Sequence, residues 1–277
     1  MLITITRTIP LYRTPEDHGV FLQWEITNPP INSDISFAIE RAGSPTGPFE
    51  HVISNIRTFY FTDTLRAIPA PGPGETRENL NYLSLIRTVY YKVTATSSSE
   101  SVSTITDVRG TLPRKLMLLR RKMLRDLSIG FKFNSVPIAV LKRRHWGIRC
   151  KVCFDLLTKK VTNSKCTSCF GTGFETGYFS PVRIPGRLLA PNSETSITPQ
   201  GKADITSVRL ICAEYPELEV DDIIVEIEQN RRYIITNQSE TTLRREMVHQ
   251  SLVMSELARD SIEYGIPANF DTSPIVY

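Results

Sequence analysis

Four cysteines in the middle of this 277-residue chain are the residues best suited to chemistry. They form two Cys-x-x-Cys pairs, Cys150 with Cys153 and Cys166 with Cys169. Two pairs at this spacing can supply four thiolates to one tetrahedral ion, at a metal–sulfur distance of about 2.3 Å. The pattern predicts one structural zinc ion per chain, with no coordination position left open for catalysis.

Other uses of these thiols stay open. Two disulfides or a redox-active pair would use the same cysteines, although two equivalent pairs favour a metal. An iron–sulfur cluster also takes four thiolates. His145 precedes the first pair, but four thiolates already complete a tetrahedron, so we do not expect it to be a ligand. The fifth cysteine, Cys212, lies in an apolar run and is expected to be a buried core thiol.

The composition indicates a globular protein that is not an enzyme. The chain is 40% hydrophobic and 22% charged, with room for two or three domains. It lacks an evident signal peptide and a membrane-spanning run, so we expect a reducing cytoplasm and no membrane. Common catalytic motifs are missing, and Asp221-Asp222 is interpreted as the start of a strand. We therefore expect no small-molecule substrate.

Positive charge is concentrated in the middle third of the chain, although the formal net charge is only +4. Such a cluster indicates a polyanion as a partner. The alternative is that some of these charges lie on a solvated helix face and others offset the negative charge of the thiolates.

The hydrophobic pattern predicts a mainly β, multidomain fold. Residues 1–110 alternate short strands with turns, which indicates a two-sheet sandwich. Residues 111–180 combine a basic helix, ended by Gly130, with the cysteine pairs of a zinc ribbon. Residues 181–277 predict a small barrel of the SH3-like or OB-like kind, followed by a C-terminal arm over 270–277. Further strands are predicted over 136–141, 203–212, 222–228, 231–236 and 247–253.

The first domain resembles a fibronectin type III domain. The resemblance rests on a strand with Trp24, an Ile-Glu-Arg strand ending at Arg41, and three further segments. Those segments are 44–50, 61–64 and 91–95. The connection over 65–88 is longer than the family pattern. The resemblance implies a module that presents a surface or acts as a spacer, with Trp24 in its core.

The rest of the chain resembles neck or head-tail connector proteins of tailed-bacteriophage virions, over about 113–267. The segments that carry it are 147–155, 166–173, 177–181, 220–225 and 231–233. The resemblance implies a virion structural protein, assembled in the host cytoplasm, that forms a homomeric ring with itself and contacts other virion proteins. It also implies basic side chains turned toward packaged DNA. These are Arg114, Lys115, Arg120, Arg121, Arg125, Arg143 and Arg144.

Two other functions stay open. The first is a cellular zinc-ribbon protein that binds nucleic acid as a monomer, with Phe131, Phe133 and Trp146 as the aromatic residues among the basic ones. The second is a chaperone, because the Cys-x-x-Cys-x-Gly-x-Gly stretch that begins at Cys166 resembles the zinc motif of heat-shock co-chaperones. That motif occurs here once, whereas those proteins repeat it.

Overall fold

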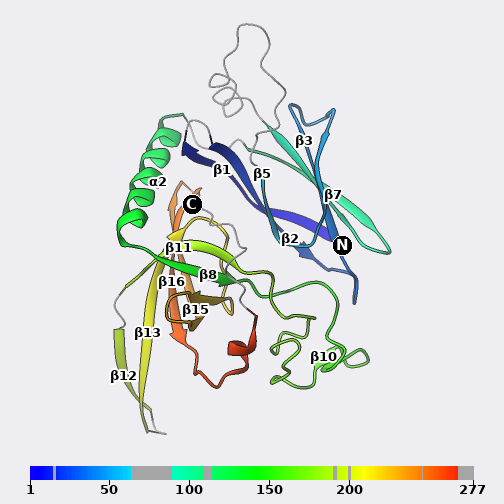
Figure 1. The fold of residues 1–277 in the computed structure, drawn as a ribbon. Helices are drawn as coiled ribbons and strands as arrows, with labels where there is room; N and C mark the ends of the chain where they lie inside the picture. The colour runs from blue at the N-terminus through cyan, green and yellow to red at the C-terminus, as the bar shows by residue number, and fades with distance from the viewer. Residues whose placement is uncertain are drawn as a thin grey trace. The chain divides into compact units, whose positions relative to one another are not determined.

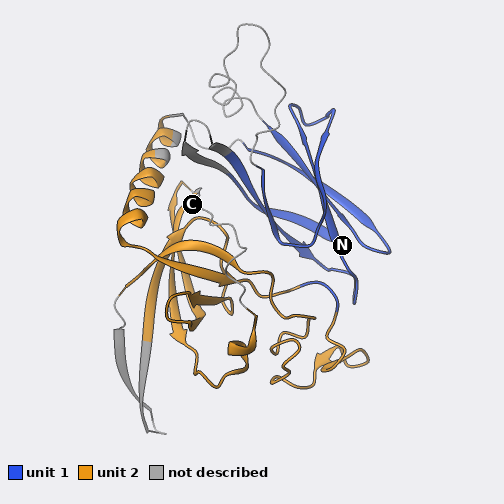
Figure 2. Ribbon diagram, viewed as in Figure 1, with its two compact units in different colours: residues 1–111, 146–148 blue, residues 112–145, 149–277 orange. Residues whose placement is uncertain are grey.

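The computed structural model shows a chain built mainly from antiparallel β-strands (Figure 1). It describes residues 1–14, 17–63, 89–108, 114–189, 192–198, 201–244 and 246–267. The chain divides into two compact units, residues 1–111 with 146–148 and residues 112–145 with 149–277 (Figure 2). The predicted mainly β class with several sheets is confirmed. Over the described ranges, no helix is both long and apolar enough to cross a membrane.

The first unit consists of two antiparallel sheets. One sheet has the strand order β1-β2-β5 and the other has the order β4-β3-β6-β7. The strands are β1 (Leu2–Thr14), β2 (Asp17–Thr27), β3 (Ser36–Ala42), β4 (Glu50–Ile56), β5 (Tyr60–Asp63), β6 (Tyr90–Thr96) and β7 (Ser101–Asp107). The long connection predicted over 65–88 lies outside the described residues.

Period-two alternation explains the core of this unit. Along β3, Phe37 and Ile39 are buried while their neighbours are partly exposed, as expected for a strand with one face toward a core. Trp24 is fully buried, with its ring centroid 4.9 Å from that of Phe37. The prediction of Trp24 as a core residue is therefore confirmed. The Tyr91 hydroxyl donates a 2.8 Å hydrogen bond to the buried carboxylate of Asp63.

The second unit contains a closed six-stranded barrel. Its strand order is β11-β8-β14-β15-β16-β13, and pairing of β11 with β13 closes it. The strands are β8 (Val136–Leu141), β11 (Val182–Leu188), β13 (Gly201–Ala213), β14 (Ile223–Glu226), β15 (Arg231–Leu243) and β16 (Glu246–Glu256). Strand β12 (Asn192–Thr198) extends the sheet beyond β13, and the 3₁₀ helix η1 (Ile262–Gly265) follows the barrel.

Gly186 lies where β11 pairs with both of its neighbours in the closed barrel. It pairs with Val136 of β8 and with Cys212 of β13, so both neighbouring strands approach it. A Cβ atom there would lie 2.6 Å from Ile138 Cδ1 and 2.7 Å from Leu210 Cδ1. A larger residue there would require the ends of both side chains to move, so glycine suits the close approach of the two strands. The strand predicted over 247–253 is confirmed within β16.

The basic helix is longer than the sequence predicts. Helix α2 (Arg114–Asn134) continues through Gly130, so the prediction that this glycine ends the helix is wrong. A glycine inside a helix costs only about 1 kcal/mol relative to alanine, and buried Phe131 anchors the turn that follows. The hairpin tip predicted at Gln229-Asn230 is longer than expected, because β14 ends at Glu226 and the turn covers 227–230, with Asn230 at φ +50°. The predicted arm over 270–277 lies outside the described residues.

Candidate metal centre

The cysteines lie in a long excursion between two neighbouring barrel strands. Strands β8 and β11 pair directly, with Val140 opposite Val182, and residues 142–181 leave the barrel between them. The two arms of the excursion are held together by isolated bridges, Arg143 with Tyr178 and Arg149 with Phe174. The short strands β9 (Phe154–Asp155) and β10 (Lys160–Val161) form a hairpin within it.

The four predicted ligands come together in one buried cluster. The sulfur atoms of Cys150, Cys153, Cys166 and Cys169 all lie within 4.8 Å of one another, and none forms a disulfide. The Cys150–Cys166 pair is 3.9 Å apart and the Cys153–Cys169 pair 3.2 Å. A tetrahedron with 2.3 Å bonds has sulfur–sulfur edges of about 3.8 Å. The four thiols can therefore hold a metal ion.

Glycines shape the second cysteine turn. Gly171 and Gly173 adopt φ +75° and +78°, a region that side chains rarely enter. At Gly171 a Cβ atom would lie 2.7 Å from the Ser164 carbonyl oxygen. The Gly173 carbonyl in turn accepts a 2.9 Å hydrogen bond from the Cys150 N–H, which joins the two cysteine turns.

The thiols differ in how readily they ionise. Burial raises the pKa of Cys153 and of Cys169, which disfavours their thiolates. Burial also tends to raise the pKa of Cys166. Hydrogen bonds from the backbone N–H groups of Ser168 and Cys169 outweigh this effect, so the pKa of Cys166 is lowered to about 7. Cys166 thus ionises more readily near neutral pH than Cys153 or Cys169.

Two contacts made by aromatic side chains lie next to the four-cysteine cluster, and the sequence interpretation predicted neither of them. The Arg149 guanidinium lies between the rings of Phe174 and Phe154, at 4.0 and 4.5 Å from their centroids. Phe170, next to Cys169, packs against the barrel core cluster that includes Ile266 and Ile223. The arginine could not be found from spacing, because its two rings lie in different turns of the excursion.

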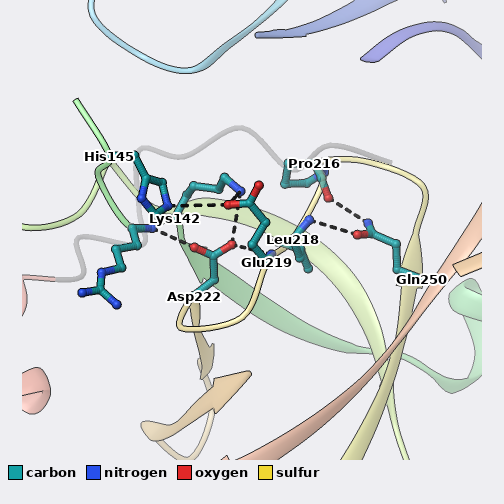
Figure 3. Close-up of polar contacts among 8 residues, drawn as sticks. Lys142, His145, Pro216, Leu218, Glu219, Asp222 and Gln250 are labelled. Carbon is teal, nitrogen blue, oxygen red and sulfur yellow. Dashed lines mark hydrogen bonds and ion pairs between the residues drawn. The ribbon is translucent and has the colours of Figure 1, made fainter. Parts of the chain in front are cut away.

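A charged clasp holds the base of the excursion to the barrel (Figure 3). The fully buried Asp222 carboxylate accepts hydrogen bonds from the N–H groups of Arg143 (2.8 Å) and Glu219 (2.9 Å). The Lys142 ammonium lies 3.0 Å from Glu219 and 3.4 Å from Asp222. Burial raises the pKa of Asp222, while Lys142 and the two N–H groups oppose that rise. Asp222 directly precedes β14, so it serves both as a strand start and as the anchor of this clasp.

His145 is part of this clasp and lies outside the thiol cluster. Its Nε2 atom is 3.5 Å from a Glu219 carboxylate oxygen. Gln250 fixes the other end of the same loop by accepting from the Leu218 N–H and donating to the Pro216 carbonyl (Figure 3). The loop over 214–222 is thus held at both ends.

The basic residues predicted to face DNA have different surroundings. Arg120 pairs with Glu214 and donates to the Met247 carbonyl, and Arg143 pairs with Asp221. The Arg144 side chain donates to the Tyr178 carbonyl and covers the ring of Phe179. Lys115 and Arg125 are exposed on α2. Arg114 and Arg121 lie on the same helix, but their side chains are outside the description. A role in binding DNA stays a prediction for all seven.

Cys212 differs from the other cysteines. It is fully buried in β13, and burial raises its pKa to about 12. Its prediction as a core thiol is confirmed.

Comparison with known proteins adds no relative. No protein-family model matches the chain, and no curated protein matches it significantly.

Proposed function

We propose that the chain is a structural component of a tailed-phage virion, a neck or head-tail connector subunit that forms a homomeric ring. The observation that carries the proposal is the four-cysteine cluster set into the β8–β11 connection of a small closed barrel. A closed barrel and a metal-held excursion are rigid, and rigid modules suit an assembly part. The protein would act in the virion after assembly in the host cytoplasm, without catalysing a reaction.

The metal in this proposal is zinc. Zinc favours four thiolates in a tetrahedron, and structural sites of this kind leave no position for water or substrate. An iron–sulfur cluster uses the same ligand set, so elemental analysis of protein purified under reducing conditions separates the two.

The first unit supports the proposed fibronectin type III module. The placement of β4 distinguishes this sandwich from a constant-type immunoglobulin domain, in which the fourth strand belongs to the sheet of the first two strands. Here β4 pairs with β3, on the sheet that also contains β6 and β7. This seven-strand order, with Trp24 in the core, fits a spacer or surface-presenting module at one end of the subunit.

Contact with packaged DNA would come from the exposed basic side chains of α2. Lys115, Lys122, Arg125 and Lys132 are exposed, whereas Arg120 is engaged with Glu214. A ring repeats each charge around its axis, so a modest excess per chain becomes a positive belt without any base-specific contact.

The test combines assembly with DNA binding. Electron microscopy and light scattering should show a closed homo-oligomer, and its DNA affinity should fall steeply with salt for every sequence alike. Changing Lys115, Lys122 and Arg125 to glutamine should weaken binding and reduce the salt slope. Arg259→Gln, which removes an exposed charge outside the helix, is the matched control. A chain that binds DNA with an unchanged slope after the triple change would exclude these three side chains as the contact.

One observation favours the alternative, a cellular zinc-ribbon protein that binds nucleic acid. Phe133 is 87% exposed near the end of α2, beside exposed Lys132, where a base could stack. Phe131 and Trp146 are buried and offer no such surface. A monomer that prefers one sequence and loses that preference in Phe133→Ala would support this alternative.

A further inference from the structure

Exposed apolar side chains lie in and beside the hairpin β9–β10. Leu157 is 94% exposed, Val152 73% and Leu156 61%. Val161, on β10, is 37% exposed. We call these four residues, with the exposed Lys159 and Lys160, the ribbon tip. Binding a metal through the four cysteines requires none of these apolar side chains, so their exposure calls for another explanation.

The turn is built to hold the two leucines outward. The Asp155 carboxylate accepts hydrogen bonds from the Leu157 N–H (2.9 Å) and the Thr158 hydroxyl (2.8 Å). Lys159 adopts φ +54°, which completes a tight turn. A fixed apolar protrusion loses little conformational entropy when a partner covers it.

Charge around the ribbon tip points to an acidic partner surface. Residues 149–170 contain five basic side chains and one acidic side chain, Asp155, which is used within the turn. The C-terminal part of the same chain has the opposite balance, because residues 171–277 contain nine basic and sixteen acidic side chains. A second copy of this chain therefore supplies the complementary charge.

The acidic part of the chain also offers an exposed apolar residue. Val220 is 51% exposed in the loop over 214–222, which carries Glu217, Glu219 and Asp221. The Glu219 and Asp221 side chains bind Lys142 and Arg143 and still remain 35% and 50% exposed. Gln250 and Asp222 fix this loop from both ends, so the Val220 surface is preorganised like the ribbon tip.

We propose that the ribbon tip of one copy docks on the loop around Val220 of the next copy. The inference rests on the proposed homomeric assembly and names the contact that builds it. Because the two surfaces are different parts of the chain, the contact is heterologous, the kind that can repeat around a ring. Burial of Leu156 and Leu157 would supply the apolar contribution, and Lys159 and Lys160 would face the carboxylates.

The test measures self-association of the full-length, metal-loaded protein by analytical ultracentrifugation. Replacing Leu156 and Leu157 together with serine should raise the dissociation constant at least about tenfold. Val220→Lys should do the same, because it places a cation against Lys159 and Lys160. Ile31→Ser removes a 54% exposed apolar side chain in the first unit and should have no effect. Unchanged zinc content verifies that the excursion is folded in each variant.

Mixing the double serine variant with the Val220→Lys variant tests the head-to-tail contact most directly. Each variant keeps one working surface, so an equimolar mixture should form a one-to-one heterodimer that cannot grow. If the mixture stays monomeric while the wild type assembles, the head-to-tail contact is wrong. If wild type and the double serine variant assemble equally, the ribbon tip is not the contact, although the proposed ring stands. A wild-type chain that stays monomeric at high concentration overturns both the contact and the ring.

Discussion

At the scale of single residues, Cys166 is the most informative position to change. Cys166→Ser removes one of four ligands and should reduce zinc content from about one ion per chain to near zero, measured by elemental analysis. Structural zinc binding amounts to about 10–16 kcal/mol, so residues 142–181 should become sensitive to protease. The barrel should stay folded, because β8 and β11 pair without the excursion.

Cys212→Ala is the matched control for this experiment, because it removes a buried thiol that is not part of the cluster. It should keep its zinc. Full metal content in Cys166→Ser, or cysteines found as disulfides in the wild type, would contradict the zinc assignment.

Sequence reasoning predicted the four-cysteine cluster but not the residues that support it. The four cysteines are recognisable by their local spacing, as is Asn230 at a hairpin tip. Arg149 and Asp222 act on partners far along the chain, such as Phe174 for the arginine and Lys142 for the carboxylate. No local pattern encodes such pairings, because they form only after the excursion has folded back on the barrel.

At the scale of elements, β16 carries a titratable group that should make the barrel sensitive to acid. Burial lowers the pKa of His249, whose Nε2 atom lies 3.1 Å from the Thr241 hydroxyl of β15. Since the folded pKa is below the unfolded one, the folded state favours the neutral ring. The contribution of His249 to stability is complete above about pH 6.5 and is lost as the pH falls through the folded pKa.

His249→Gln tests this contribution, because glutamine keeps a polar contact with Thr241 but does not titrate. The free energy of unfolding, measured in urea between pH 7 and pH 5, should fall less steeply for the variant than for the wild type. Equal slopes would show that His249 titrates alike in the folded and unfolded chains.

Elements with clear periodicity were predictable, whereas their connections were not. The alternation in β3 and the apolar run of β14 indicate strands from sequence alone. The barrel closes through pairing of β11 with β13 near Gly186, a residue that locally predicts a weakened strand. The continuation of α2 past Gly130 depends on burial of Phe131, a tertiary contact that outweighs helix propensity.

At the scale of the whole molecule, the two units should differ in their part in assembly. A truncated chain of residues 112–277 keeps the barrel, the four-cysteine cluster and the ribbon tip. We expect it to assemble like the full chain, judged by light scattering. Trp146 groups with the first unit, where its ring contacts Phe37, so the truncated chain should carry Trp146→Gln to avoid an exposed indole.

The result that would contradict this division is a truncated chain that is folded, binds zinc and stays monomeric. The first unit would then belong to the assembly interface instead of acting as a spacer. Circular dichroism and zinc content provide the evidence of folding that this conclusion needs.

The placement of the cysteine excursion between β8 and β11 also has a kinetic consequence. These neighbouring barrel strands are separated by residues 142–181, and joining the ends of a long flexible loop carries an entropic cost that slows folding. A bound ion that ties Cys150 to Cys169 shortens the flexible part of that loop before the strands meet. Metal binding would then precede the pairing of β8 with β11 during folding. Refolding should therefore be faster with zinc present than after chelation.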